Sequence, residues 1–473
     1  MHRRRDFLKS TAAGVAGALL ARGHTVRSEG VGGRRPHILF VLTDQMRCGA
    51  LGCYGNRHTR TPYLDGLAAK GVRFERAYCA NALCVPSRVA MATGQMPGRL
   101  GIYQNKDGRV PINATAAAHS LGVLMKQAGY ATFYGGKVHM SPNLAPAVAG
   151  YDHVERDERD LLPERCLEFL CEARSSPAFA VASFLNPHDI CYLHALREGQ
   201  SRQVPPGLAD LYRRALSLPE TQLPPLPSNF AVPKDEPAGL PMNEDPDAPT
   251  PAGLMRKTFT ERDWRIYRWV YARLVEQVDA QIGRLLDGLR QGGLDRTTLI
   301  LVTSDHGDME ASHRLASKRF FYEESARVPL IVRPPGGPRT GRVDRSHLVS
   351  TGLDLLPTFC DYAERPRPPG LLGRSLRPLI EGHAPSDWRS FVVCEERNGR
   401  MVRTTRFKYC VYANGAIEES LFDLESDPDE LRNLAGDPSQ AEVLTEHRHL
   451  LREWVVATND ADGMRFIKRA DRR

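Results

Sequence analysis

The sequence predicts an α/β fold with a large, mostly parallel central sheet flanked by helices. Short apolar runs alternate with longer segments whose apolar residues recur at helical spacing, as in 116–128 and 261–289. The runs are almost continuously apolar, which is typical of strands buried on both faces of a parallel sheet. These strands are expected at 37–43, 131–134, 179–185 and 299–304.

The N-terminus is typical of a twin-arginine export signal. Arg4 and Arg5 precede Asp6-Phe7-Leu8-Lys9 and an Ala/Gly-rich apolar run that ends at Ala21. This run is shorter than the roughly 20 residues that a spanning helix needs. We therefore expect a signal peptide and linker over 1–30, the twin-arginine export machinery as a partner, a periplasmic or secreted bacterial location, and no stable membrane span.

The net charge of +8 is concentrated at the two ends of the chain. Residues 1–30 hold six basic against two acidic side chains, and 468–473 hold four against one. The rest is nearly neutral, so the charge does not predict a nucleic-acid-binding face. Ten cysteines in 473 residues are too few for a disulfide scaffold.

Two proline-rich segments divide the chain. Twelve prolines fall between Pro205 and Pro251, so the insertion 195–260 is expected to have little regular structure. It is interpreted as a substrate-shaping loop, with disorder as the alternative. The second segment, 366–370, predicts a boundary between a catalytic domain, 36–365, and a C-terminal subdomain, 366–473. In that subdomain, a small antiparallel sheet is expected from strands 390–395 and 406–412, with a helix over 440–455.

Polar side chains follow each of the four predicted strands. They are Asp44 and Gln45, Lys137 and His139, His188 in Asn-Pro-His-Asp, and Asp305 and His306. In open α/β sheets, ligands bind outside the carboxyl ends of the strands. Side chains from four distant segments are therefore predicted to meet in one site.

A helix is predicted to begin in Cys84-Val85-Pro86-Ser87-Arg88. Pro86 is compatible with a first helical turn, and Gly94 can end the helix. Cys84 is then expected at the positive end of the helix dipole, with Arg88 on the same side. A cysteine in this position can also be a packing residue, so the motif alone leaves both interpretations open.

This motif, together with the strand-end residues in their order, resembles the sulfatase family from about residue 36 to about residue 433. Residues 421–428 with Asn433 and Leu434 resemble the sulfatase C-terminal subdomain. The resemblance implies an alkaline-phosphatase-like sandwich and a formylglycine, made from Cys84 by a maturation enzyme. It also implies one divalent cation with these ligands: Asp44, Gln45, Cys84, Asp305 and His306.

The resemblance implies Ca²⁺ as the cation, because the ligands are rich in oxygen. Many family members have Asp in place of Gln45 and Asn in place of His306. An imidazole ligand leaves Mn²⁺ or Zn²⁺ as alternatives.

The resemblance also implies roles for the remaining residues. Lys137 and Lys318 would stabilise negative charge on the sulfuryl group, and Arg88 would hold the aldehyde hydrate. His139 would deprotonate or orient a hydroxyl of this hydrate, and His188 would protonate the leaving alcohol.

The predicted function is therefore a sulfatase acting on a sulfated small molecule or glycan, such as a glycosaminoglycan-type carbohydrate. One alternative is a phosphonate or phosphate mono- or diesterase of the same superfamily. The other is an unmatured, non-catalytic glycan-binding protein.

Overall fold

The computed structural model describes residues 35–157, 159–172, 176–200, 204–205, 207–237, 239–240, 250–336, 340–413 and 417–470. The predicted twin-arginine signal, residues 1–30, lies outside the described residues. None of the helices within the described ranges is long and apolar enough to cross a membrane.

The central sheet has eight strands in the order β5-β4-β6-β1-β7-β8-β2-β9. Their bounds, in that order, are His153–Glu155, Ala131–Gly136, Ala178–Pro187, His37–Asp44, Thr298–Ser304, Leu330–Arg333, Val72–Phe74 and Arg342–Asp344. Strand β1 pairs in parallel with β6 and β7, while β8 runs antiparallel to both β7 and β2. The predicted large, mostly parallel sheet is confirmed.

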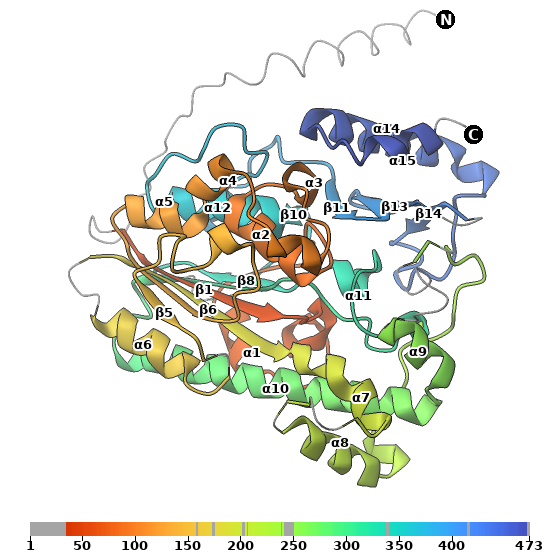
Figure 1. Ribbon diagram of the computed structural model, residues 1–473, viewed down its shortest axis with the longest axis horizontal. Coiled ribbons are helices and arrows are strands. Elements are labelled where there is room, and N and C mark those ends of the chain that lie inside the picture. The colour runs from red at the N-terminus through yellow and green to blue at the C-terminus, as the bar shows by residue number, and fades with distance from the viewer. Residues whose placement is uncertain are drawn as a thin grey trace, which may run out of the picture. The chain divides into compact units, whose positions relative to one another are not determined.

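Helices cover both faces of this sheet (Figure 1). Successive side chains of a strand point to opposite faces, and in β1 both sets are apolar, so both faces are packed against helices. On β1, Ile38, Phe40 and Leu42 pack on the side of α5 (Leu121–Gln127) and α12 (Thr351–Tyr362). Leu39 and Val41 pack on the other side, with α1 (Pro62–Ala68), α6 (Leu162–Glu172) and α10 (Glu261–Gln291). The apolar run is therefore buried on both faces.

Two predicted helices have different outcomes. The helix expected at 261–289 is confirmed as α10, which begins with a reciprocal capping box between Thr260 and Asp263. The prediction of one helix over 116–128 is wrong. The chain forms α4 (Ala114–Ala118) and α5, since Ser120 between them has an extended backbone with ψ 157°.

The proline-rich insertion has more regular structure than we expected. It contains α8 (Leu208–Ser217) and α9 (Pro251–Thr258), and α8 packs on α10. The prolines do not prevent these helices because they lie at the helix boundaries. Pro251 occupies the first turn of α9, where a missing N–H has no cost, and Pro219 follows the end of α8.

The C-terminal part forms an antiparallel sheet covered by a helix, as predicted, but the sheet has four strands where two were expected. Its strands β11–β14 are Val392–Glu396, Gly399–Arg403, Phe407–Tyr412 and Glu419–Asp423. Helix α14 (Ala441–Thr458) packs on it through a separate apolar cluster. Apart from α2 and short 3-10 helices, the other strands and α-helices of the described residues are β3 (Ala77–Tyr78), β10 (Val349–Ser350), α3 (Pro97–Leu100), α7 (Leu193–Arg197), α11 (Glu323–Ala326), α13 (Arg377–Glu381) and α15 (Met464–Ala470).

Helix α2 (Cys84–Thr93) begins near the carboxyl ends of β1 and β7, because Cys84 lies beside Asp44 and Asp305. It ends at Gly94, whose left-handed φ of 66° allows the chain to leave the helix. The predicted helix start and stop are thus confirmed, with Cys84 in the first turn.

Candidate active site

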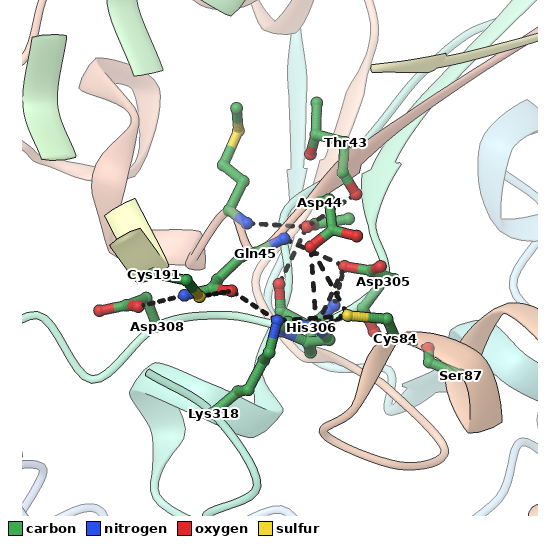
Figure 2. A network of polar contacts seen from close by, with 12 residues as sticks. Thr43, Asp44, Gln45, Cys84, Ser87, Cys191, Asp305, His306, Asp308 and Lys318 are labelled. Atoms are coloured by element: carbon green, nitrogen blue, oxygen red, sulfur yellow. Dashed lines mark hydrogen bonds and ion pairs between the residues drawn. The ribbon is translucent and has the colours of Figure 1, made fainter. Parts of the chain in front are cut away.

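Four predicted residues form one compact cluster (Figure 2). The potential ligand atoms of Asp44, Cys84, Asp305 and His306 all lie within 4.8 Å of one another, and all four residues are buried. Asp44 ends β1, Cys84 begins α2, and the other two follow β7. The structure therefore brings together the distant segments that the sequence predicted to converge.

Backbone hydrogen bonds fix the orientation of Asp305 and His306. Asp305 Oδ1 accepts hydrogen bonds from the N–H groups of Gln45 at 3.0 Å and His306 at 2.9 Å. His306 Nδ1 lies 2.9 Å from the Gly307 carbonyl, to which its N–H donates. Burial opposes the charged form of His306, but Asp305 and Cys84 raise its pKa to about 9, so the metal-free ring is protonated. Once this proton is lost to a bound cation, the other ring nitrogen, Nε2, 3.2 Å from Cys84 Sγ, is the acceptor. A fixed tautomer of this kind is usual for metal-binding histidines.

Arg88 connects both carboxylates to the neighbouring strands. Its Nε donates to Asp305 Oδ2 at 2.8 Å, and its Nη2 donates to Asp44 Oδ2 at 3.1 Å. Its Nη1 donates to the Lys137 carbonyl at 3.1 Å and to Ser183 Oγ at 2.8 Å. The side chain is fully buried, so a permanent positive charge compensates two carboxylates that water does not reach.

Two lysines add positive charge beside the cysteine. Lys137 Nζ lies 2.5 Å from Asp44 Oδ2, and Lys318 Nζ lies 3.2 Å from Cys84 Sγ. Burial and the nearby Asp44 raise the pKa of the Cys84 thiol, but Lys318, Lys137 and His306 outweigh them and bring this pKa well below its ordinary value. The electrostatics of the site thus favour an anion at the position of Sγ.

Gln45 faces this centre through its side-chain oxygen. Gln45 Oε1 accepts hydrogen bonds from Lys318 Nζ at 2.7 Å and from the Cys191 thiol at 3.1 Å. On its other side, Nε2 donates to Asp308 Oδ2 at 2.6 Å. The ligand role predicted for Gln45 stays a prediction.

The two predicted catalytic histidines lie in different surroundings. His188 follows β6 and is hydrogen-bonded to Cys84, while its buried Nδ1 has no partner among the described residues. Burial and Lys318 lower the pKa of His188, so its neutral form is favoured. His139 follows β4 with an exposed side chain and a left-handed φ of 44°. The described residues give this side chain no hydrogen bond to the cluster.

A strained loop carries Lys318. Six residues other than glycine have positive φ there, between 45° and 78°: Glu310, Ala311, His313, Arg314, Ser317 and Arg319. The insertion holds this loop, because Asn229 O accepts from His313 N–H at 2.6 Å and Arg256 Nη2 donates to His313 O at 2.7 Å. Such strain at a functional site persists only where its surroundings fix it.

Sequence reasoning missed several contributors to the site. Ser183 and Cys191 lie in or just after the β6 run, and Tyr267 lies in an apolar helical stripe. Asn105 accepts the N–H of Val85 at 3.1 Å at the start of α2. Asp189, which follows His188, is buried in a bidentate ion pair with Arg159.

The cluster is chemically suited to a divalent cation. It offers two carboxylates, one imidazole nitrogen with a fixed tautomer, and the Cys84 side chain. Oxygen-rich ligands favour hard cations such as Ca²⁺, and the imidazole extends the range to Mn²⁺ or Zn²⁺. Asp44, Asp305 and His306 are thus able to hold the ion that the sequence predicted.

Comparison with known proteins gives consistent results. The family model "Sulfatase" matches residues 36–364, and "N-sulphoglucosamine sulphohydrolase, C-terminal" matches residues 311–456. A Delta 4,5-hexuronate-2-O-sulfatase of Bacteroides thetaiotaomicron is 30% identical, with 90% of each chain covered. An N-acetylglucosamine-6-O-sulfatase of the same organism is 27% identical, covering 91% of this chain and 88% of the relative.

A solved structure extends the similarity to the fold. It is described as a complex with its substrate, D-glucosamine-2-N,6-O-disulfate, and it superposes with a TM-score of 0.74 at 25% identity. The match covers 91% of this chain and 99% of the other. The predicted alkaline-phosphatase-like α/β fold is confirmed.

Proposed function

Because the chain belongs to the sulfatase family, we propose that it removes sulfate from a glycosaminoglycan-type carbohydrate through a formylglycine made from Cys84. The observation that carries this proposal is the meeting of Cys84 with Asp44, Asp305, His306 and Lys318 in one buried site. In the described structure the Cys84 sulfur stands in for an oxygen of the aldehyde hydrate. That hydrate supplies the nucleophilic hydroxyl.

The cation is proposed to be Ca²⁺, held by Asp44, Asp305, His306 and the Gln45 oxygen, with Mn²⁺ or Zn²⁺ as alternatives. When bound, it withdraws electron density from the sulfuryl oxygens and stabilises negative charge there. Arg88 keeps both carboxylates in place. Its positive charge favours their ionised form, although burial and the nearby Asp44 still leave the pKa of Asp305 above its ordinary value.

The remaining side chains supply charge and protons. Lys137 and Lys318 compensate the negative charge of the sulfate group, which otherwise repels a nucleophile. His188 delivers a proton to the oxygen of the leaving alcohol. Its lowered pKa means that this proton is easily given up once it has been acquired. His139 is proposed to act on the second hydroxyl of the hydrate from the exposed side.

The mass of the Cys84 peptide tests the nucleophile. Conversion of cysteine to formylglycine replaces sulfur by oxygen and removes two hydrogens, so the matured peptide is lighter. An unchanged mass in active protein would exclude this nucleophile. An unchanged mass in inactive protein that still binds glycans would favour the non-catalytic alternative.

Parallel assays test the reaction class and substrate. Rates on an aryl sulfate and on the matching aryl phosphate and phosphonate esters separate a sulfatase from the esterase alternative. Two sulfated disaccharides follow from the relatives: one with a 2-O-sulfated unsaturated uronate and one with a 6-O-sulfated N-acetylglucosamine. Preference for a phosphate or phosphonate ester would refute the proposal.

We also propose twin-arginine export to the periplasm or cell exterior after maturation by a formylglycine-generating enzyme. The proposed division is a catalytic domain over 36–365 and a subdomain over 366–473. Replacing Arg4 and Arg5 by lysine is expected to hold the protein in the cytoplasm. Cell fractionation followed by immunoblotting measures this outcome.

A further inference from the structure

The side-chain amide of Gln45 lies between groups of opposite hydrogen-bonding character (Figure 2). Its oxygen faces two donors, the Lys318 ammonium and the Cys191 thiol, at 2.7 Å and 3.1 Å. Its nitrogen faces the Asp308 carboxylate at 2.6 Å. A half-turn of the amide would exchange its oxygen and nitrogen with almost no change in shape. Its hydrogen-bond partners therefore decide which atom faces the Cys84 centre.

Asp308 is held rigidly for this task. The residue is fully buried, and its Oδ1 accepts the Glu310 N–H at 2.7 Å. The Tyr267 hydroxyl lies 3.1 Å from Oδ1 and 2.9 Å from Oδ2. On the opposite side of the Gln45 amide, the Lys318 ammonium can only donate, so the amide oxygen faces Lys318 and the NH₂ group faces Asp308.

We propose that Asp308 is a positioning residue which, through Gln45, keeps an amide oxygen turned toward Lys318 and the cation site. This inference rests on the proposed function, since it concerns the cation and the charge around the nucleophile. With the amide reversed, an NH₂ group would face the Lys318 ammonium. It would offer no lone pair to a divalent cation beside Asp44.

The substitution Asp308→Asn tests the proposal at almost constant volume. The Asn oxygen would keep the bond from Glu310 N–H, which leaves its NH₂ toward Gln45 and favours the reversed amide. Isothermal titration of metal-free protein with CaCl₂ is expected to show affinity about 10–100-fold weaker, as for other partners of metal ligands. A comparable loss of kcat/KM on 4-methylumbelliferyl sulfate is expected.

The exchange Gln45→Glu/Asp308→Asn is the decisive variant. It keeps the total charge, and it moves the carboxylate to position 45 and the amide to position 308. The Asn NH₂ then donates to one Glu oxygen, and the other oxygen faces Lys318. In a double-mutant cycle with both single variants, we expect favourable coupling of at least about 10-fold in Ca²⁺ affinity. A purely structural Asp308 would not give this rescue.

Additional measurements distinguish the possible failures. Tyr267→Phe removes a donor to Asp308 but leaves the Gln45–Asp308 bond, so a smaller loss of Ca²⁺ affinity is expected. Near-UV circular dichroism checks that each variant is folded. Wild-type-like Ca²⁺ affinity of Asp308→Asn, or a cycle without coupling, would overturn the inference alone. A wild-type protein that neither binds Ca²⁺ nor cleaves the sulfate ester would instead overturn the proposed function.

Discussion

Replacement of Arg88 by methionine is expected to destabilise the metal-free protein strongly. The guanidinium makes four hydrogen bonds, two of them to the buried carboxylates of Asp44 and Asp305. Lys137 remains as a partner of Asp44, so Asp305 is the group left without a guanidinium. Removing one partner of a buried ion pair costs about 3–5 kcal/mol.

The loss is measurable as a change in melting temperature. Residues 35–473 form one compact unit, whose unfolding entropy is on the order of 0.9 kcal/mol/K. A loss of 3–5 kcal/mol then lowers Tm by about 3–5 °C in calorimetry with EDTA present. EDTA is needed because a bound cation would compensate the carboxylates.

Ser183→Ala is the matched control for this prediction. It removes one neutral partner of the same guanidinium, the 2.8 Å bond to Ser183 Oγ. The expected loss is about 1–2 kcal/mol, clearly below that of Arg88→Met. Equal melting temperatures for the two variants would refute the idea that Arg88 compensates buried carboxylates.

Three further predictions concern separate parts of the chain. Burial raises the pKa of Asp279, which accepts the N–H groups of Tyr63 and Leu64 at the start of α1, to about 6. The folded state therefore binds the Asp279 proton more tightly than the unfolded state does. This tighter binding adds up to about 3 kcal/mol to the free energy of unfolding below pH ~4, and the contribution is lost as the pH rises to ~6. Urea unfolding should show a flatter pH profile for Asp279→Asn, and an unchanged profile would contradict this cause. Thr260→Ala removes the N-cap of α10 and should lower the free energy of unfolding in urea by about 1 kcal/mol. An unchanged urea midpoint would mean that the cap does not stabilise the protein. Lys318→Met should lower kcat/KM on an aryl sulfate by about 10²–10³-fold, because a preorganised charge at the anion is lost; retained activity would argue against its role.

The features predicted most accurately from the sequence are those encoded locally. The β1 and β7 runs and the acids that follow them are contiguous in the chain, and Pro86 and Gly94 punctuate α2 within one segment. Once these strands are placed in a parallel sheet, their carboxyl ends lie at the same edge, so the meeting of the residues that follow them could also be predicted.

Features set by distant partners could not be predicted. Strands β12 and β14 were not recognised, because buried charged residues such as Arg400 and Glu419 interrupt their apolar pattern. The orientation of Gln45 depends on Asp308, 263 residues away, and no local pattern records that contact. The exposure of His139 likewise depends on the surrounding loops rather than on its own motif.

In the strained loop over 310–319, which carries Lys318, six residues other than glycine have positive φ. Non-glycine residues in this conformation cost roughly 1–3 kcal/mol each, and Asn229 and Arg256 hold His313 in it from outside the central sheet. The position of Lys318 beside Cys84 therefore depends on a strained loop that the insertion 195–260 holds in place. Shortening that segment is therefore expected to relax the loop and to withdraw the Lys318 ammonium from Cys84.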